Sequence, residues 1–360
     1  MQLPSHGANP QLLAQSLKSE MIKGSLDFSV NVNPFPPLKE IESTWGNLYE
    51  EILHYPDPTC SDFIQIATGK DGVEKEQILP GNGAAELIFL IAQAYRGSKV
   101  LIVEPAFSEY RDACTANGCE VYSYLTKKEN AWKLNVEELQ AHLTGKKLCF
   151  LCHPSNPTGT SYTLDELEAI INLTATYDVT LVIDEAFLHF MEKPISAVPF
   201  LKHYSHLIIL RSLTKMFHLP GARIGYALAS EEQINCLKAL QPPWSVNGVA
   251  QRLGSICLMN GEMYIKQTAQ NISLERRRIF PILNFFGFEV SPSSVNFYLL
   301  QRKESREDHF PLLQFLFSNG IIVRHTENFR GIDGKGLRIA VRTPIENDRL
   351  LTVLESWTYS

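Results

Sequence analysis

The sequence predicts a doubly wound α/β domain with a mostly parallel sheet, followed by a smaller α+β domain.

 The first observation is that short apolar segments alternate with helix-spaced segments from about residue 80 onward. The second is that the later apolar segments are almost continuously hydrophobic, as in strands covered by helices on both faces. The third is a change after Pro242 and Pro243, where long helical stretches replace the alternation.

The elements of the α/β domain follow one another in short cycles. Residues 98–105 have the pattern of a β-branched strand, and residues 107–118 have helical spacing and end at a glycine. The strongest helix signal begins at Thr163, which can cap the helix, with Glu166 three residues later completing a capping box. Further strands are expected in CEVYSYL, KLCFLCHP, TLVIDEAF, HLIILRSL and ARIGYALA.

The chain is expected to divide into three parts. Residues 1–40 form an N-terminal arm, proline-rich and irregular, that packs on the second domain or on a partner subunit. Residues 41–243 form the large α/β domain. Residues 244–360 form the smaller domain, with two helices first, then strands in FEV, VNFYLL, IIVRH and LRIAVR and helices at 306–318 and 346–357.

Composition narrows the class of protein. The chain has 360 residues, 44% hydrophobic and 20% charged, which describes a soluble globular protein with a sizeable core. Its net charge of −6 and its lack of long basic runs argue against a nucleic-acid-binding surface, and its apolar stretches are too short to span a membrane. The N-terminus lacks the pattern of a secretory signal, so we expect a cytoplasmic protein.

The cysteines do not predict a metal site. There are seven, and Cys149 and Cys152 have the C-x-x-C spacing within an expected strand. Residues three apart on a strand point to opposite faces, so these two thiols cannot bind one metal ion together. We therefore expect reduced cysteines and no metal.

One lysine stands out by its surroundings. Lys215 follows the hydroxyl residues Ser212 and Thr214, and Arg223 comes eight residues later. A Schiff base to a phosphorylated aldehyde needs an amine that can lose its proton, beside donors that hold a phosphate. A lone lysine is more often an ordinary surface residue, so this interpretation depends on the other motifs.

Polar residues at the ends of the expected strands supply those motifs. Asp184 ends one strand and can pair with a pyridine nitrogen, or can simply cap a helix. Asn156, in SNPTG, follows another strand and can donate to the 3′-oxygen of a pyridine cofactor that carries such an aldehyde, although Asn-Pro is also a common turn. Tyr110 could stack on the pyridine ring, with Phe107 as the other candidate.

Anion-binding groups complete the set. The start of a helix at Gly83, Ala84 and Ala85 can bring backbone N–H groups and the helix dipole to a phosphate. Arg338 lies on an expected strand and can bind a carboxylate with two hydrogen bonds, and Arg324 supplies a second cation. Surface salt bridges are the alternative explanation for both arginines.

In identity and order, these motifs resemble those of the fold-type I pyridoxal-phosphate (PLP) enzymes of the aminotransferase class I/II superfamily. The resemblance runs from about residue 27 to the C-terminus. It implies PLP as cofactor, with Lys215 as the lysine that carries it and Asp184 as the partner of its ring nitrogen. It also implies a homodimer, in which Tyr55 of HYPD reaches the cofactor phosphate of the neighbouring subunit.

Two branches of the superfamily are similar to this chain, the threonine-phosphate decarboxylases and the histidinol-phosphate aminotransferases. HGAN at 6–9, DFSVNVNP at 27–34 and DEAF at 184–187 resemble the decarboxylase branch more closely. That branch implies decarboxylation of O-phospho-L-threonine to (R)-1-amino-2-propanol phosphate in cobalamin (cobamide) biosynthesis. The substrate-binding residues it implies are His6, Gly7, Ala8, Asn31, Asn156, Arg324 and Arg338.

Some residues depart from that pattern and leave alternatives open. Ala8 stands where the branch has a second glycine, RHTENFRG at 324–331 differs from the expected segment, and Phe187 cannot donate to the 3′-oxygen. Transamination of histidinol phosphate with 2-oxoglutarate is the first alternative, and decarboxylation of O-phosphoserine is a narrower one. A non-catalytic PLP-binding module is the alternative from another class of protein.

Overall fold

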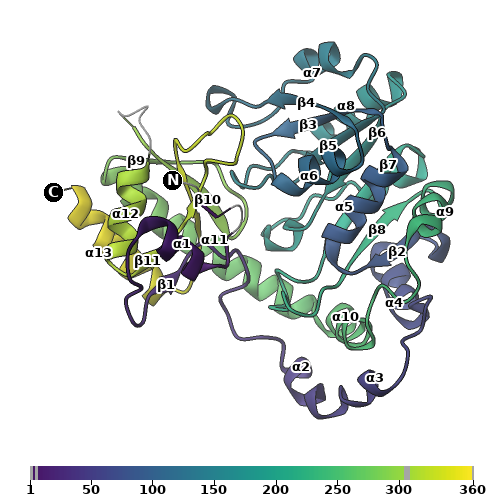
Figure 1. Ribbon diagram of the computed structural model, residues 1–360, viewed down its shortest axis with the longest axis horizontal. Helices are drawn as coiled ribbons and strands as arrows, with labels where there is room; N and C mark the ends of the chain where they lie inside the picture. The colour runs from purple at the N-terminus through teal and green to yellow at the C-terminus, as the bar shows by residue number, and fades with distance from the viewer. Residues whose placement is uncertain (1–2, 5–6, 304–308, 359–360) are drawn as a thin grey trace.

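The computed structural model describes residues 3–4, 7–303 and 309–358. Figure 1 shows a seven-stranded sheet with its helices on one side of the molecule and a four-stranded sheet with its helices on the other. The long helix α11 (Glu262–Phe285) extends from the first part into the second. The division of the chain at residues 40 and 243 remains a prediction.

The seven-stranded sheet is mostly parallel, as the sequence predicts. The strand order is β2-β8-β7-β6-β5-β3-β4, in which β8 runs antiparallel to both of its neighbours and the strands from β7 to β4 run parallel. Because β3, β5, β6 and β7 share one direction, their carboxyl ends lie at one edge of the sheet. The strands are β2 (Ile78–Gly81), β3 (Lys99–Glu104), β4 (Glu120–Leu125), β5 (Leu148–Cys152), β6 (Thr180–Asp184), β7 (Leu207–Ser212) and β8 (Gly225–Ala229).

Helices cover both faces of this sheet, which explains the continuous hydrophobicity of its strands. On β6, Leu181 and Ile183 belong to one apolar cluster and Val182 to the other. Cys149 and Cys152 on β5 likewise fall in different clusters, as expected. One cluster includes α5 (Gly83–Ala94), α6 (Ser108–Ala116) and α9 (Glu231–Leu240), and the other includes α4 (Ser61–Asp71), α7 (Val136–Leu143), α8 (Leu164–Thr176) and α10 (Gly248–Asn260).

The four-stranded sheet is antiparallel. Its order is β12-β13-β10-β9, and the helices around it are α11, α12 (Phe310–Ser318) and α13 (Pro344–Thr358). Among the helices of the described residues, none is both long and apolar enough to cross a membrane. The strands are β9 (Phe288–Val290), β10 (Phe297–Arg302), β12 (Arg324–His325) and β13 (Leu337–Ala340).

The N-terminal arm is more regular than we expect from its sequence. It contains α1 (Pro10–Leu17), where the Asn9 side chain accepts a hydrogen bond from the Leu12 N–H at 3.3 Å and caps the helix. It also contains β1 (Leu26–Asp27), which pairs in parallel with β11 (Ile321–Ile322). Neither element is predicted from the sequence, because a capped helix of eight residues and a two-residue strand are too short to give a periodic pattern, and the rest of the described arm before Lys39 is irregular. The arm packs on the C-terminal part of the chain.

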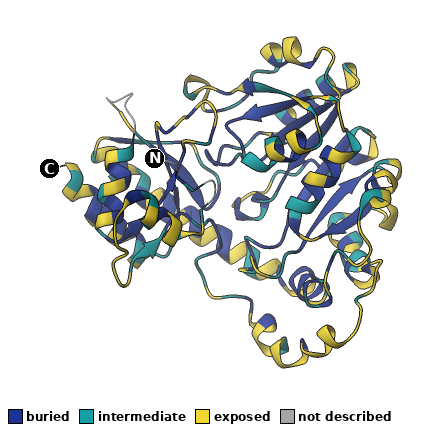
Figure 2. Cartoon of the chain, viewed as in Figure 1, coloured by how far each residue is buried: buried dark blue, intermediate teal, exposed yellow. Residues whose placement is uncertain are grey.

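The segment after the arm projects from the molecule. It carries α2 (Lys39–Thr44) and α3 (Glu50–Leu53), whose residues are largely exposed in Figure 2. Its exposed side chains include several large apolar ones, namely Trp45, Tyr49, Ile52, Leu53 and Tyr55.

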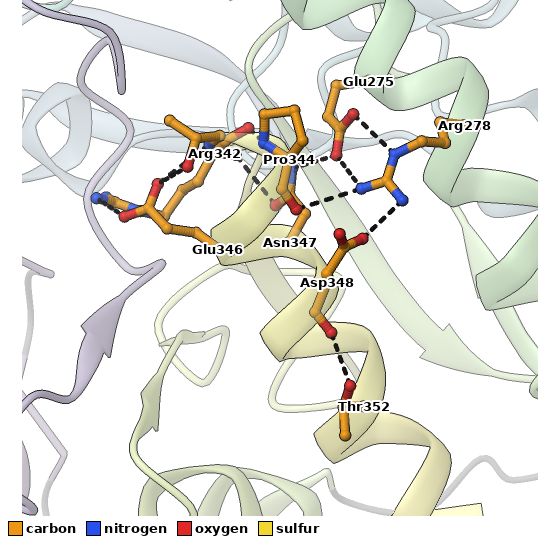
Figure 3. A network of polar contacts seen from close by, with 9 residues as sticks. Glu275, Arg278, Arg342, Pro344, Glu346, Asn347, Asp348 and Thr352 are labelled. Carbon is orange, nitrogen blue, oxygen red and sulfur yellow. Dashed lines mark hydrogen bonds and ion pairs between the residues drawn. The ribbon is translucent and has the colours of Figure 1, made fainter.

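A polar network holds α11 against α13, as Figure 3 shows. Arg278 pairs with Glu275 at 2.6 Å, and the Asn347 side-chain amide donates to the same carboxylate at 2.9 Å. Nearby, Arg342 donates to Glu346 at 2.6 Å and to the backbone carbonyl of Asp27 at 2.9 Å. Arg342 thus links the residues that follow β13 to the N-terminal arm, and its guanidinium is bound by groups of the protein itself.

Candidate active site

A cavity of about 360 Å³ lies beyond the carboxyl ends of β5, β6 and β7. Its walls come from the strand ends of the large sheet, from the N-terminal arm and from the four-stranded sheet. Most of the residues that the sequence predicts for one site line it: Gly7, Ala8, Asn31, Ala84, Ala85, Tyr110, Asn156, Asp184, Ser212, Thr214, Lys215, Arg223, Arg324 and Arg338.

Among the residues that the structure describes, two predicted ones do not line this cavity. Gly83 lies just behind its wall, against the Arg223 guanidinium. Tyr55 is 83% exposed and packs on Trp244, with 5.0 Å between ring centroids. His6 lies outside the described residues.

Lys215 is held in the turn that follows β7. Its backbone carbonyl accepts a hydrogen bond from the Asn33 N–H at 2.9 Å, and the Asn33 side chain donates to the next carbonyl, that of Met216, at 2.9 Å. Burial, followed by the charges of Arg338 and Arg223, lowers the pKa of Lys215 to about 8. A fraction of its amine is therefore unprotonated near neutral pH, as a nucleophile requires.

Asp184 is a buried carboxylate at the end of β6, with only 5% of its surface exposed. The Tyr110 hydroxyl donates to its Oδ2 at 2.5 Å, and the Ala186 N–H donates to its Oδ1 at 2.9 Å. Burial raises the pKa of Asp184, while these two hydrogen bonds and the charge of Lys215 act in the opposite direction. The contact with Ala186 resembles a helix cap, but the carboxylate also faces the cavity.

Tyr110 has a different place from the stacking position that we expect. Its side chain is fully buried, and its ring stacks on Phe150 with 5.0 Å between centroids and an interplanar angle of 11°. Phe107, the other candidate, is half-buried and lines the cavity just before α6. Phe107 is therefore the better placed of the two to stack on a ring in the cavity.

An anion cradle lies at the start of α5. Gly83 has a φ of +77°, and a Cβ built there would lie 2.6 Å from Arg223 Nη2. A Cβ on Gly225 would lie 2.8 Å from the backbone nitrogen of Ala84. The two glycines let the helix N-terminus, Arg223 and the hydroxyls of Ser212 and Thr214, which lie 2.8 Å apart, gather at one end of the cavity.

Arg338 and Asn156 meet at the opposite wall. Arg338 Nη1 donates to Asn156 Oδ1 at 2.8 Å, and Nη2 donates to the backbone carbonyl of Ser29 at 2.7 Å. Its Nε has no hydrogen-bond partner within residues 3–4, 7–303 and 309–358. Burial, followed by the charge of Arg324, lowers the pKa of Arg338 to about 9. An anion that entered the cavity would therefore be favoured beside this guanidinium.

Arg324 lies at the start of β12, beneath the N-terminal arm. Its Nη1 donates to the carbonyl of Pro4 at 3.1 Å, and its Nη2 donates to the Asn328 side chain at 2.6 Å. Burial lowers the pKa of Arg324 to about 10. Both arginines are buried, so the surface salt bridges considered from the sequence do not describe them.

The family model for aminotransferase class I and II matches residues 25–354. The chain belongs to this family. It is 32% identical, over 92% of its length and 90% of the relative's, to a threonine-phosphate decarboxylase of Salmonella typhimurium. It is 30% identical, over 95% of its length and 99% of the relative's, to a histidinol-phosphate aminotransferase of Caldanaerobacter subterraneus.

One further relative is much longer than this chain. The adenosylcobalamin biosynthesis bifunctional protein CobDQ of Leptospira interrogans is 32% identical over the whole of this chain. The chain spans 42% of that protein's length. The likeness therefore concerns one part of the bifunctional protein.

Solved structures from both branches share the fold. The histidinol-phosphate aminotransferase of Clostridium acetobutylicum superposes with a TM-score of 0.87 at 28% identity, covering 93% of this chain and 99% of that one. The L-threonine-O-3-phosphate decarboxylase of Porphyromonas gingivalis gives 0.83 at 26% identity, covering 93% and 100%. The fold is thus that of the fold-type I PLP enzymes, as the sequence predicts.

The cofactor of this family member is PLP, and the cavity fits it. The cradle at Gly83 has backbone, hydroxyl and guanidinium donors for a phosphate dianion. Lys215 offers an amine of lowered pKa, and Asp184 offers a buried carboxylate for a ring nitrogen. When bound, PLP supplies the electron sink that stabilises negative charge at the substrate's Cα.

Several residues of the site were not predicted from the sequence. Ser29 accepts from Arg338 through its backbone carbonyl and from the Ala8 N–H through its hydroxyl, at 3.3 Å. Asn33 holds the lysine turn, and Asn328 holds Arg324. Ser29 and Asn33 belong to DFSVNVNP, so that motif carried a signal, whereas the position of Asn328 depends on tertiary structure alone.

Proposed function

We propose that this protein decarboxylates O-phospho-L-threonine to (R)-1-amino-2-propanol phosphate and CO2, with PLP as cofactor. The observation that carries the proposal is a pair of buried arginines facing one cavity from different strands, Arg338 on β13 and Arg324 on β12. Two buried cations that lie apart from the phosphate cradle are suited to a substrate with two anionic groups. Phosphothreonine has both a carboxylate and a phosphate.

The roles of the residues follow from their positions. Arg338 would bind the carboxylate. Its Nε has no hydrogen-bond partner within the described residues, and Asn156 holds its Nη1 in place. Arg324, beside Gly7 and Ala8 of the arm, would bind the substrate phosphate. Lys215 would hold PLP and, in its protonated form, would deliver a proton to the substrate's Cα after CO2 has left.

Transamination of histidinol phosphate is the second candidate, since relatives of both kinds match at 30–32% identity. Histidinol phosphate has one anionic group, so one of the two arginines would have no anion to bind. In a transaminase that arginine would bind the carboxylate of the second substrate, 2-oxoglutarate, instead. The two functions therefore differ in whether an acceptor is needed.

A panel of substrates separates these functions. Purified protein loaded with PLP is given phosphothreonine, phosphoserine, or histidinol phosphate with 2-oxoglutarate, and CO2, amine and glutamate are measured. We expect CO2 and aminopropanol phosphate from phosphothreonine without any 2-oxo acid. Glutamate formed from histidinol phosphate, with no CO2 from phosphothreonine, would establish the transaminase, and binding of PLP without turnover of any compound would indicate a non-catalytic module.

We also propose that two copies of the chain form a dimer in which each copy contributes residues to the other's active site. We propose that this dimer acts in the cytoplasm. The projecting segment presents Trp45, Tyr49, Ile52 and Tyr55, which are 64–83% exposed, with Trp244 packed on Tyr55. An exposed apolar set of this kind is typical of an interface between proteins.

Light scattering would give the mass of the assembly in solution. Mixing a Lys215→Ala variant with a Tyr55→Phe variant would restore activity if Tyr55 acts in the partner's site, because one of the two sites in the mixed dimer is then intact.

A further inference from the structure

Tyr110 is placed directly behind Asp184. It lies on α6, and its hydroxyl donates to Asp184 Oδ2 at 2.5 Å across 74 positions of sequence. Burial and the neighbouring Asp184 raise the pKa of Tyr110 well above its ordinary value, so the hydroxyl keeps its proton and acts as the donor. The contact is thus a buried hydrogen bond to a carboxylate.

The packing of Tyr110 leaves its hydroxyl little freedom. The Tyr110 ring stacks on Phe150 of β5. It also meets the ring of Phe107 edge-on, with 6.0 Å between the Tyr110 and Phe107 centroids and an interplanar angle of 84°. The Ala186 N–H holds the other oxygen of Asp184 at 2.9 Å. Two donors from different elements therefore fix the plane of the carboxylate as well as its position.

We propose that Tyr110 is a positioning residue, whose hydroxyl keeps Asp184 an ionised and oriented carboxylate for the ring nitrogen of PLP. The inference rests on the proposed role of Asp184. A buried carboxylate without this donor would be a stronger base, because burial disfavours its charged form. The proton between Asp184 and the ring nitrogen would then move toward the carboxylate. With Tyr110 in place, the proton stays on the ring.

The test replaces the hydroxyl and nothing else. In Tyr110→Phe, we expect the 15N chemical shift of the ring nitrogen of bound, labelled PLP to move toward its unprotonated value. In the cofactor-free protein, the carboxyl group of Asp184 should titrate at higher pH, as followed by infrared difference spectroscopy against Asp184→Asn. We expect kcat to fall about tenfold, the factor that corresponds to one pKa unit, with KM changed less than about twofold.

The chain offers a matched control. The Tyr226 hydroxyl donates to Asp71 Oδ2 at 2.8 Å, and Tyr226 is also buried. Tyr226→Phe removes the same kind of hydrogen bond and should leave the ring-nitrogen signal unchanged. An unchanged 15N shift in Tyr110→Phe with PLP bound would overturn the inference.

Fluorinated tyrosines at position 110 give a second measurement that does not depend on folding of the phenylalanine variant. More fluorine makes the hydroxyl a stronger donor, so the titration of Asp184 should move to lower pH through the series. No trend would again overturn the inference. Failure of the proposed role of Asp184 looks different, because Asp184→Asn would then leave the ring-nitrogen signal of bound PLP unchanged.

Discussion

The two ends of the cavity are built in different ways. The end that we assign to the cofactor, with Asp184, Ser212 and Lys215, uses the ends of neighbouring parallel strands within one sheet. The end that we assign to the substrate joins the arm to the four-stranded sheet, because Arg338 donates to the backbone carbonyl of Ser29 across 309 positions of sequence. The cofactor end is therefore fixed by the fold, whereas the substrate end depends on contacts between distant segments and can vary while the fold stays the same.

The largest effect is expected at the cofactor end. Lys215→Ala removes the amine that we expect to bond to PLP and to move the proton, so activity should fall about a thousandfold or more. The cradle at Gly83 is untouched, so PLP should still bind. Borohydride reduction followed by peptide mapping checks which lysine bonds to PLP. We expect label on Lys215 in the unaltered protein and none in the variant. Label on another lysine of the unaltered protein would contradict our assignment.

At the substrate end, Arg338→Gln should reduce kcat/KM for phosphothreonine about a hundredfold. The expected loss is about 2.7 kcal/mol, near the upper end of the roughly 1.5–3 kcal/mol that hydrogen bonds to a charged group contribute. Arg342→Gln is the control, since Arg342 lies four residues away and is engaged with Glu346 in the network of Figure 3. Arg342→Gln should lower the melting temperature with little change in KM. Equal kinetic losses in the two variants would show that Arg338 has a structural role alone.

Arg324→Gln should weaken binding of the phosphate about tenfold to thirtyfold. The effect is smaller than at Arg338 because Gly7 and Ala8 of the arm also face this end of the cavity. The measurement compares phosphothreonine with threonine, which has no phosphate, as competitors for the site. We expect the loss for phosphothreonine alone, and an equal loss for both compounds would place the phosphate elsewhere.

The difference between the two ends also decides what could be predicted from the sequence. Asp184 and Lys215 follow apolar strands, and parallel strands bring their carboxyl ends to one edge, so their proximity could be inferred. The hydrogen bond from Tyr110 to Asp184 could not, because it depends on how α6 is rotated against β5. The hydrogen bond from Arg324 to the carbonyl of Pro4 could not be predicted either, because it joins residues 320 positions apart. Sequence pattern predicts elements and their order, while these contacts depend on side-chain packing.

The pH dependence of cofactor capture tests the environment of Lys215. Because the pKa of Lys215 is lowered to about 8, the unprotonated fraction of its amine should rise about tenfold per pH unit below pH 8 and level off above it. The rate at which cofactor-free protein takes up PLP should follow this curve, as measured by stopped-flow absorbance. Arg338→Gln removes a neighbouring positive charge and should move the midpoint to higher pH. A midpoint near 10.5, the ordinary value for lysine, would contradict the burial of this amine.

The smallest effect is expected in the arm, where Ala8 has a φ of +62°. An alanine in this left-handed region is strained, so Ala8→Gly should raise the free energy of unfolding by about 1 kcal/mol, as measured in denaturant. Gly7→Ala is the matched opposite, since a Cβ there would lie 2.9 Å from the carbonyl oxygen of Ser29 and should destabilise the arm. Both residues line the substrate end, so their effects on KM should exceed those on PLP affinity. Equal effects on both would mean that the arm supports the whole cavity, and that its two ends are less independent than their construction suggests.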